Sequence, residues 1–178
     1  MSIRTYIGCM FSGKTSEIQR EYTRWKNIGK NVIIINYTDD NRYGNDNFVY
    51  SHDNHKVPSV KAKKLLELSS EEVGRNDVII INEGQFFEDL IEFCKIWCEK
   101  HNKNIVVCGL DGDFLRRPFG QMNDLISLSD EVIKLKAFCK KCNDGTQALF
   151  SKRTTSDTQS VVIGTDMYMP VCRKHYID

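Results

Sequence analysis

Residues 8–15 read Gly8-Cys9-Met10-Phe11-Ser12-Gly13-Lys14-Thr15, which matches the pattern Gly-x-x-x-x-Gly-Lys-Ser/Thr at every fixed position. In such a loop, glycines let backbone amides turn toward phosphate oxygens, the lysine brings charge to the β- and γ-phosphates, and the hydroxyl can bind Mg²⁺. A strand pattern over 3–7 precedes the loop, and a helical pattern from Lys14 to Ile28 follows it, so a helix dipole would also face the anion. The stretch therefore predicts a phosphate-binding loop (P-loop) for ATP or GTP, with all eight residues as candidate contacts.

Strand-like and helix-like segments alternate over the first 137 residues. Three runs are apolar at every position, as expected of strands buried on both faces of a sheet: Val32–Ile35, Val78–Ile81 and Ile105–Cys108. Around them we expect a long loop or hairpin over 38–60, helices over 61–73 and 87–101, and a short helix followed by a strand over 121–136. This order predicts an α/β fold of the P-loop NTPase (RecA-like) kind, a parallel sheet with helices on both faces.

An acidic residue follows the second buried strand, where the chain reads Asn82-Glu83-Gly84-Gln85-Phe86-Phe87. In a P-loop fold the carboxyl end of this strand lies beside the phosphates. Glu83 is therefore a candidate base for an attacking hydroxyl. Asn82 could accept a hydrogen bond from a metal-bound water, although it adds no charge. The alternative interpretation is a solvated glutamate that caps the next helix.

The chain has seven cysteines, an odd number that argues against a disulfide framework. Cys94, Cys98 and Cys108 fall in apolar stretches and are expected to be small core residues. The others of interest form two pairs, Cys139-x-x-Cys142 and Cys172-x-x-His175. This spacing predicts a structural Zn²⁺ site, because four protein ligands leave no coordination position open for catalysis. A lone Cys-x-x-Cys could instead be redox-active.

The composition is that of an ordinary globular protein, with 40% hydrophobic and 28% charged residues. The 25 basic and 24 acidic side chains give a net charge of +1, which argues against a nucleic-acid-binding protein with a basic face. No apolar run approaches the roughly 20 residues of a membrane-spanning helix, and the N-terminus lacks the apolar stretch of a signal peptide. We therefore expect a soluble, cytoplasmic protein that binds neither membrane nor nucleic acid.

These motifs together resemble the cytosolic-type thymidine kinases, the zinc-bearing P-loop enzymes of animals, many bacteria and large DNA viruses. The matching stretches run in family order along the whole chain: Gly8–Thr15, Ser51-His-Asp53, Glu83–Phe87, Leu110–Phe114, Arg117–Gly120, Ser151–Arg153, and Asp166–Tyr168 leading to Cys172–His175. The resemblance implies transfer of the γ-phosphate of ATP to the 5′-hydroxyl of thymidine, giving dTMP. It also implies a P-loop domain over 1–138 and a zinc-binding module over 139–178.

The resemblance further implies roles for single residues. Glu83 matches the catalytic base, and the positions associated with Mg²⁺ are Thr15, Asn82 and Asp53. The thymidine pocket would be lined by Met10, Phe86, Leu110, Phe114 and Tyr168. A lasso loop over about 143–170 would contact the base through Ser151, Val161, Val162, Ile163 and Gly164. Family members are mostly homotetramers, and many are inhibited by dTTP.

This sequence departs from the family pattern at a few places. Asn82 stands where the family generally has aspartate, and Asn54 and His55 follow Asp53 where an arginine often appears. The segment 162–166 is one residue shorter than usual, and His175 replaces a cysteine found in some members. Two other classes remain open from the residues alone: a P-loop ATPase or GTPase switch, which would need no apolar pyrimidine pocket, and a zinc-knuckle nucleic-acid-binding protein, which should have a basic face.

Overall fold

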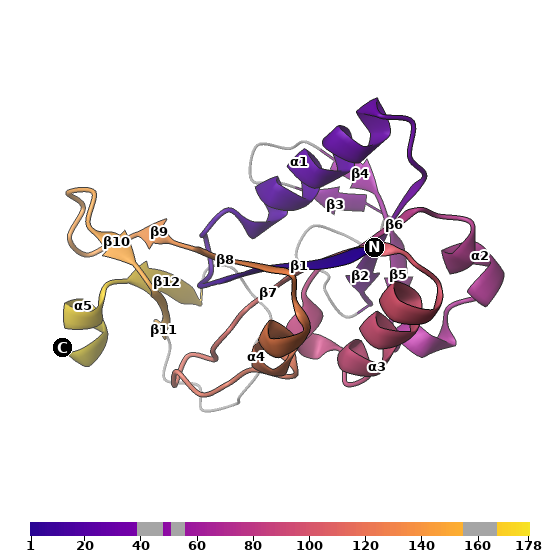
Figure 1. Cartoon of the computed structure of the whole chain (residues 1–178). Coiled ribbons are helices and arrows are strands. Elements are labelled where there is room, and N and C mark those ends of the chain that lie inside the picture. The colour runs from indigo at the N-terminus through magenta and orange to yellow at the C-terminus, as the bar shows by residue number, and fades with distance from the viewer. Residues whose placement is uncertain (39–47, 51–55, 155–166) are drawn as a thin grey trace.

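A computed structural model of the chain describes residues 1–38, 48–50, 56–154 and 167–178 (Figure 1). Six of the described strands form one sheet, in the spatial order β5-β2-β6-β7-β1-β8, and every neighbouring pair is parallel. Their bounds are β1 Ser2–Gly8, β2 Val32–Tyr37, β5 Val60–Ala62, β6 Val78–Ile81, β7 Asn104–Gly109 and β8 Glu131–Leu135. The predicted parallel sheet is confirmed, and the carboxyl ends of its strands meet at one edge.

Helices cover both faces of this sheet (Figure 1). Helix α1 (Lys14–Asn27) covers one face, where its Ile18 packs with Tyr6, Ile34, Ile80 and Val106. The opposite face packs against α2 (Ser70–Gly74), α3 (Leu90–Lys95) with its π-helical continuation Ile96–Lys100, and α4 (Met122–Leu125) with the 3₁₀ turn Ile126–Leu128. Because successive residues of a strand point to opposite faces, the all-apolar runs of β2, β6 and β7 supply both cores.

The predicted helix over 61–73 is wrong in part. Val60–Ala62 forms β5, which pairs with β2 and becomes the edge of the sheet. A 3₁₀ turn, Leu65–Glu67, and the short helix α2 then follow. The break between them has a local cause, because the side chain of Ser69 accepts a hydrogen bond from the amide of Glu72 and starts a new helix.

The other helical and core predictions are closer to the structure. The helix expected over 87–101 begins at Leu90 and runs to Lys100. Cys94, Cys98 and Cys108 are buried, as expected of core residues, and burial raises the pKa of each of these thiols. In the segment 38–60, β3 (Phe48–Tyr50) and β4 (Lys56–Pro58) pair antiparallel, so the hairpin alternative is correct for the described part. Among the described residues, no helix has the length and apolarity needed to cross a lipid bilayer.

After β8 the chain builds a smaller, separate cluster. Two antiparallel pairs form there, β9 (Ala137–Phe138) with β10 (Gln147–Ala148) and β11 (Phe150–Arg153) with β12 (Tyr168–Val171), and α5 (Arg173–Ile177) follows. Their buried residues Ala137, Cys139, Ala148 and Val171 pack together with Cys9 of the P-loop. The C-terminal segment therefore rests directly on the loop expected to bind phosphate.

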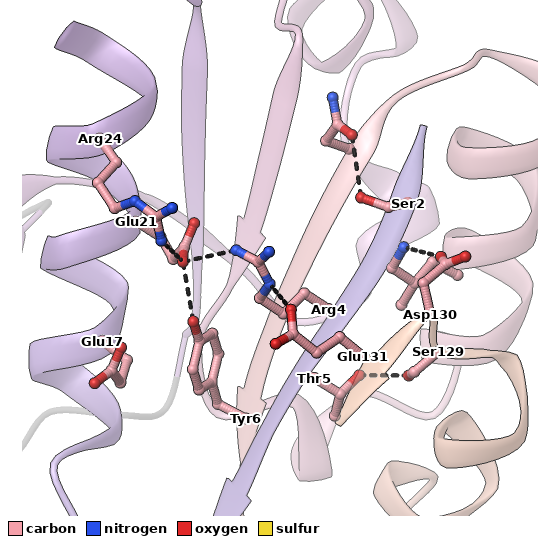
Figure 2. Close-up of polar contacts among 12 residues, drawn as sticks. Ser2, Arg4, Thr5, Tyr6, Glu17, Glu21, Arg24, Ser129, Asp130 and Glu131 are labelled. Atoms are coloured by element: carbon pink, nitrogen blue, oxygen red, sulfur yellow. Dashed lines mark hydrogen bonds and ion pairs between the residues drawn. The ribbon is translucent and has the colours of Figure 1, made fainter. Parts of the chain in front are cut away.

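A buried carboxylate anchors α1 to the sheet (Figure 2). Glu21 is only 1% exposed, and its Oε1 accepts hydrogen bonds from Arg4 Nη1 at 2.9 Å, Tyr6 Oη at 2.9 Å and Arg24 Nη1 at 3.1 Å. Arg4 in turn donates through Nε to Glu131 on β8 at 2.6 Å. The network joins α1, β1 and β8, and so supports the helix whose first turn borders the P-loop.

We expect Glu21→Gln to lower the free energy of unfolding by about 2–3 kcal/mol, because the change leaves buried Tyr6 and two partly exposed arginines without their charged acceptor. The expected loss is smaller than the loss on breaking a fully buried ion pair, because Arg4 is 31% exposed and its charge is partly solvated. Urea unfolding would measure the change. The matched control is Glu71→Gln, whose ion pair with Arg75 is exposed on both sides and should contribute little. Equal losses for the two variants would contradict the anchoring role.

Candidate active site

The loop between β1 and α1 has a backbone that its two glycines make possible. Gly8 has φ +155°, and a Cβ there would lie 2.5 Å from the carbonyl oxygen of Leu135. Gly13 has φ +87°, a left-handed conformation that favours glycine, and α1 begins at the next residue. The chain thus turns sharply and presents the first turn of α1 to the loop, the arrangement that binds phosphate at a helix N-terminus.

The side chain of Lys14 lies within this loop. Its Nζ donates to the carbonyl oxygens of Cys9 at 2.7 Å and Gly8 at 3.1 Å. The amide of Met10 donates to Ser151 Oγ at 2.9 Å, which ties the loop to β11. The Cys9 side chain is buried against the C-terminal cluster, so any contact it makes with phosphate is through its backbone. Thr15 and Ser12 are half-buried, and Phe11 is exposed.

Glu83 lies at the same edge of the sheet, just after β6. The residue is 8% exposed, and its backbone is left-handed at φ +54°, an uncommon conformation for a residue other than glycine. It precedes the 3₁₀ turn Gly84–Phe86, but its carboxylate makes no capping hydrogen bond to that turn. The interpretation of Glu83 as a solvated helix cap is therefore wrong. Its Oε2 instead accepts a hydrogen bond from Gln85 Nε2 at 2.6 Å.

Asn82 is also buried, with 5% of its surface exposed. Its Nδ2 donates to Asn36 Oδ1 at 2.9 Å, on the adjacent strand β2. This contact fixes the side-chain amide at the carboxyl edge of the sheet. Asn82 brings hydrogen-bonding groups to this edge where an aspartate would bring a charge.

Aromatic side chains form a cluster beside Glu83. The ring of Phe86 stacks on Tyr37 with centroids 5.0 Å apart and meets the edge of Phe119 at 5.5 Å. Phe119 belongs to the matching stretch Arg117–Gly120, but neither it nor Tyr37 is among the pocket residues expected from the sequence. Such rings supply an apolar surface suited to a flat base. Leu110, half-buried, follows β7 at the same edge.

Phe114 and Tyr168, two of the expected pocket residues, both contact Arg153. The guanidinium carbon of Arg153 is 3.7 Å from the centre of the Phe114 ring and 5.2 Å from that of Tyr168. Its Nη2 also donates to Tyr168 Oη at 2.6 Å. Arg153 thus joins β11, β12 and the segment after β7 through one cation, a role that no sequence pattern indicated.

Cys139, Cys142, Cys172 and His175 converge on one point, with all four candidate ligand atoms within 4.8 Å of one another. Cys142 Sγ lies 3.8 Å from Cys172 Sγ, and His175 Nδ1 lies 3.3–3.6 Å from the three sulfurs. Zinc bonds of about 2.3 Å to sulfur and about 2.0 Å to nitrogen imply ligand separations of about 3.5–3.8 Å in a tetrahedron. The set therefore fits Zn²⁺.

The environment favours thiolate, the form that binds metal, at Cys139. Burial opposes ionisation of Cys139, but hydrogen bonds from the backbone amides of Cys172 and Cys142 outweigh it and lower the pKa of Cys139 to about 6. At Cys142, burial and the neighbouring thiols of Cys139 and Cys172 instead raise the pKa to about 11. The cluster joins the turn after β9 to the first turn of α5. A metal ion held there would fix the two ends of the C-terminal segment to each other.

Comparison with known proteins decides the family. The family model described as "Thymidine kinase" matches residues 1–176. The chain belongs to the thymidine kinase family. It is 42% identical over 182 residues to a thymidine kinase of rice, a match that covers 99% of this chain and 66% of the rice protein. It is also 42% identical over 177 residues to the thymidine kinases of variola virus and vaccinia virus, which it covers over 97% of their length.

In this member of the thymidine kinase family, most of the site residues expected from the sequence lie in two neighbouring groups. The P-loop, Asn82, Glu83, Phe86 and Leu110 follow strands that end at one edge of the sheet. Ser151 links this edge to the C-terminal segment that carries Tyr168. Five expected contacts, Asp53, Val161, Val162, Ile163 and Gly164, lie outside the described residues.

We expect freshly purified protein to contain one tightly bound zinc ion per chain, and Cys172→Ser to lose it. Structural zinc sites contribute on the order of 10–16 kcal/mol of apparent binding free energy to the folding of small modules. Elemental analysis would measure the zinc content, with Cys98→Ala as a control because Cys98 lies in the core between α3 and the sheet. Absence of zinc from the wild type, or full retention in Cys172→Ser, would contradict the site.

Proposed function

We propose that this chain is a thymidine kinase that transfers the γ-phosphate of ATP to the 5′-hydroxyl of thymidine, giving dTMP and ADP. The observation that carries the proposal is that the buried carboxylate of Glu83 lies at the same edge of the sheet as the P-loop. The chain's membership of the thymidine kinase family supports the same reaction. A phosphate cradle after β1 and a base after β6, at the same edge of the sheet with β7 between them, suit transfer to an alcohol.

In this proposal the P-loop holds the triphosphate. Backbone amides of residues 8–15 and the dipole of α1 stabilise the β- and γ-phosphates. Lys14 stabilises the negative charge that develops on the β–γ bridging oxygen as its bond to the γ-phosphorus breaks. Thr15 and Asn82, and Asp53 by resemblance, would hold Mg²⁺, which when bound neutralises phosphate charge.

Glu83 serves as the base for the acceptor. It takes the proton of the 5′-hydroxyl while that oxygen forms its bond to the γ-phosphorus and ADP leaves. Its burial supports this role, because an exposed carboxylate would be surrounded by water, which would compete with the nucleoside hydroxyl for the γ-phosphate.

The thymidine would lie against the aromatic cluster. Met10, Phe86, Leu110, Phe114 and Tyr168 supply the apolar surface, and we add Phe119 because its ring contacts Phe86. Ser151 and residues 161–164 would contact the base from the lasso loop. By family likeness, we further propose a cytoplasmic homotetramer inhibited by dTTP, with Zn²⁺ in a structural role at Cys139, Cys142, Cys172 and His175.

A panel of nucleosides tests the substrate. The protein would be incubated with labelled ATP and thymidine, deoxyuridine, deoxycytidine, deoxyadenosine or deoxyguanosine, and the nucleoside monophosphates separated. We expect label to enter the thymidine product fastest. A purine nucleoside as the best acceptor would contradict the apolar pyrimidine pocket.

The buried amide of Asn82 leads to a separate prediction. We expect Asn82→Asp to lower the Mg²⁺ concentration needed for half-maximal rate. A carboxylate makes charge-assisted hydrogen bonds to metal-bound water that are roughly twice as strong as neutral ones. Asn36 can rotate its own amide to donate to the new carboxylate, so the contact that holds residue 82 is kept. Repulsion of Glu83 opposes the gain, but bound Mg²⁺ offsets that charge.

The measurement is a Mg²⁺ titration of initial rate at saturating nucleotide. Asn76→Asp is the matched control, because it adds the same charge just before β6, at the opposite end of the strand. We expect it to leave the Mg²⁺ requirement unchanged. An unchanged or higher requirement in Asn82→Asp would show that this side chain does not contact water bound to the metal.

A further inference from the structure

Gln85 connects Glu83 to the segment that follows β7. The residue is 3% exposed, its Nε2 donates to Glu83 Oε2 at 2.6 Å, and its Oε1 accepts from the backbone amide of Leu110 at 2.9 Å. A backbone N–H can only donate, so the atom that faces Leu110 must be the oxygen. The amide group of Gln85 therefore has one possible orientation, and a donor always faces the carboxylate of Glu83.

The surroundings of Gln85 are shaped to hold it. A Cβ at Gly109 would lie 2.8 Å from Gln85 Oε1, and a Cβ at Gly120 would lie 2.1 Å from the backbone oxygen of Gln85. These separations are shorter than atoms in contact allow, so a side chain at either glycine would displace Gln85. Two segments, the end of β7 and the chain before α4, thus close around this residue.

The segment that Gln85 holds also carries candidate substrate contacts. Leu110, whose amide it binds, is half-buried at the edge of the sheet, and Phe119 precedes Gly120 and contacts Phe86. One side chain is thus bonded both to the candidate base and to the backbone that carries the pocket. A hydrogen bond to a charged group is among the stronger contacts in proteins.

We propose that Gln85 is a positioning residue for the reaction: it holds the carboxylate of Glu83 as an acceptor in one orientation and couples it to the pocket segment through Leu110. This inference rests on the proposed role of Glu83 as the base. Gln85 touches no reacting atom and acts through Glu83. A base must lie within hydrogen-bond reach of the hydroxyl proton, so loss of its orientation slows the transfer.

Two variants of Gln85 separate its two hydrogen bonds. Gln85→Met has nearly the same shape and removes both bonds. Gln85→Glu keeps the acceptor for Leu110 but replaces the donor with a second carboxylate, and two adjacent carboxylates cannot both ionise readily. We expect each variant to lower kcat about 10–100-fold, the effect of one lost hydrogen bond to a charged group, with the KM for ATP within about twofold of wild type.

Gln121→Met is the matched control. Gln121 also accepts a hydrogen bond from a backbone amide, that of Ile91 at 2.9 Å, but it makes no hydrogen bond to Glu83. We expect its kcat to stay within about twofold of wild type. Zinc content and thermal unfolding temperature, measured for every variant, would identify any variant that has not folded. If one Gln85 variant does not fold, the kcat of the other still tests the positioning role.

The double variant Glu83→Gln/Gln85→Met distinguishes positioning from a general structural role. If Gln85 acts through Glu83, the second change lowers kcat no further than Glu83→Gln alone, whereas independent effects multiply. Multiplied losses, or wild-type kcat in Gln85→Glu, would overturn the inference. A wild-type kcat in Glu83→Gln itself would instead contradict the assignment of Glu83 as the base.

Discussion

Lys14→Ala is expected to lower kcat by at least about a thousandfold, which corresponds to about 4 kcal/mol of transition-state stabilisation. Lys14 is the side-chain cation that the P-loop itself supplies, and its Nζ lies at the carbonyl oxygens of Gly8 and Cys9. Charge moves toward the bridging oxygen in the transition state, so a cation there acts more strongly than in the ground state. Steady-state kinetics at saturating ATP would measure the loss.

Lys26→Ala is the control for this variant, because Lys26 is an exposed lysine in the last turn of the same helix. We expect its kcat to be unchanged. Folding of Lys14→Ala would be checked by its zinc content and its unfolding temperature. A folded Lys14→Ala protein with kcat within about tenfold of wild type would contradict the phosphate-binding assignment of residues 8–15.

Glu83→Gln is expected to retain ATP binding and to lose turnover by about 10²–10⁴-fold, the usual contribution of a positioned base. The amide keeps the shape of the side chain and removes its basicity. Rapid-quench measurement of a single turnover would show whether the chemical step slows, and a binding titration would show that the affinity for ATP does not change.

The matched control is Glu88→Gln, an exposed glutamate five residues further along the chain, which should behave like wild type. Asp53→Asn provides the competing assignment. If Glu83→Gln turns over normally while Asp53→Asn is inactive, Glu83 is not the base, and its burial needs another explanation.

The parts of the site that the sequence predicted are those whose chemistry is local. Residues 8–15 specify their loop through two glycines and the flanking strand and helix, all within one short stretch. The four ligands of the zinc cluster form two pairs with short spacing, so each pair is visible before the fold is known. The buried strands were predicted for a similar reason, because β2, β6 and β7 are apolar at every position.

The parts that the sequence did not predict depend on which strands lie side by side. Gln85 meets the amide of Leu110 because β6 and β7 are neighbours, and Glu21 meets Arg4 because α1 lies across β1. The pairing of Tyr37 with Phe86 likewise joins the end of β2 to the turn after β6. Composition and periodicity do not give strand order, so such contacts become visible only in the folded chain.

The measurement that tests the central claim most directly is the fate of the γ-phosphate of labelled ATP, followed with and without thymidine. We predict that label appears in dTMP, that a 5′-nucleotidase releases it from there, and that little label reaches inorganic phosphate when thymidine is absent. Release of inorganic phosphate at the same rate in both reactions, with no labelled dTMP, would contradict the account and indicate an ATPase.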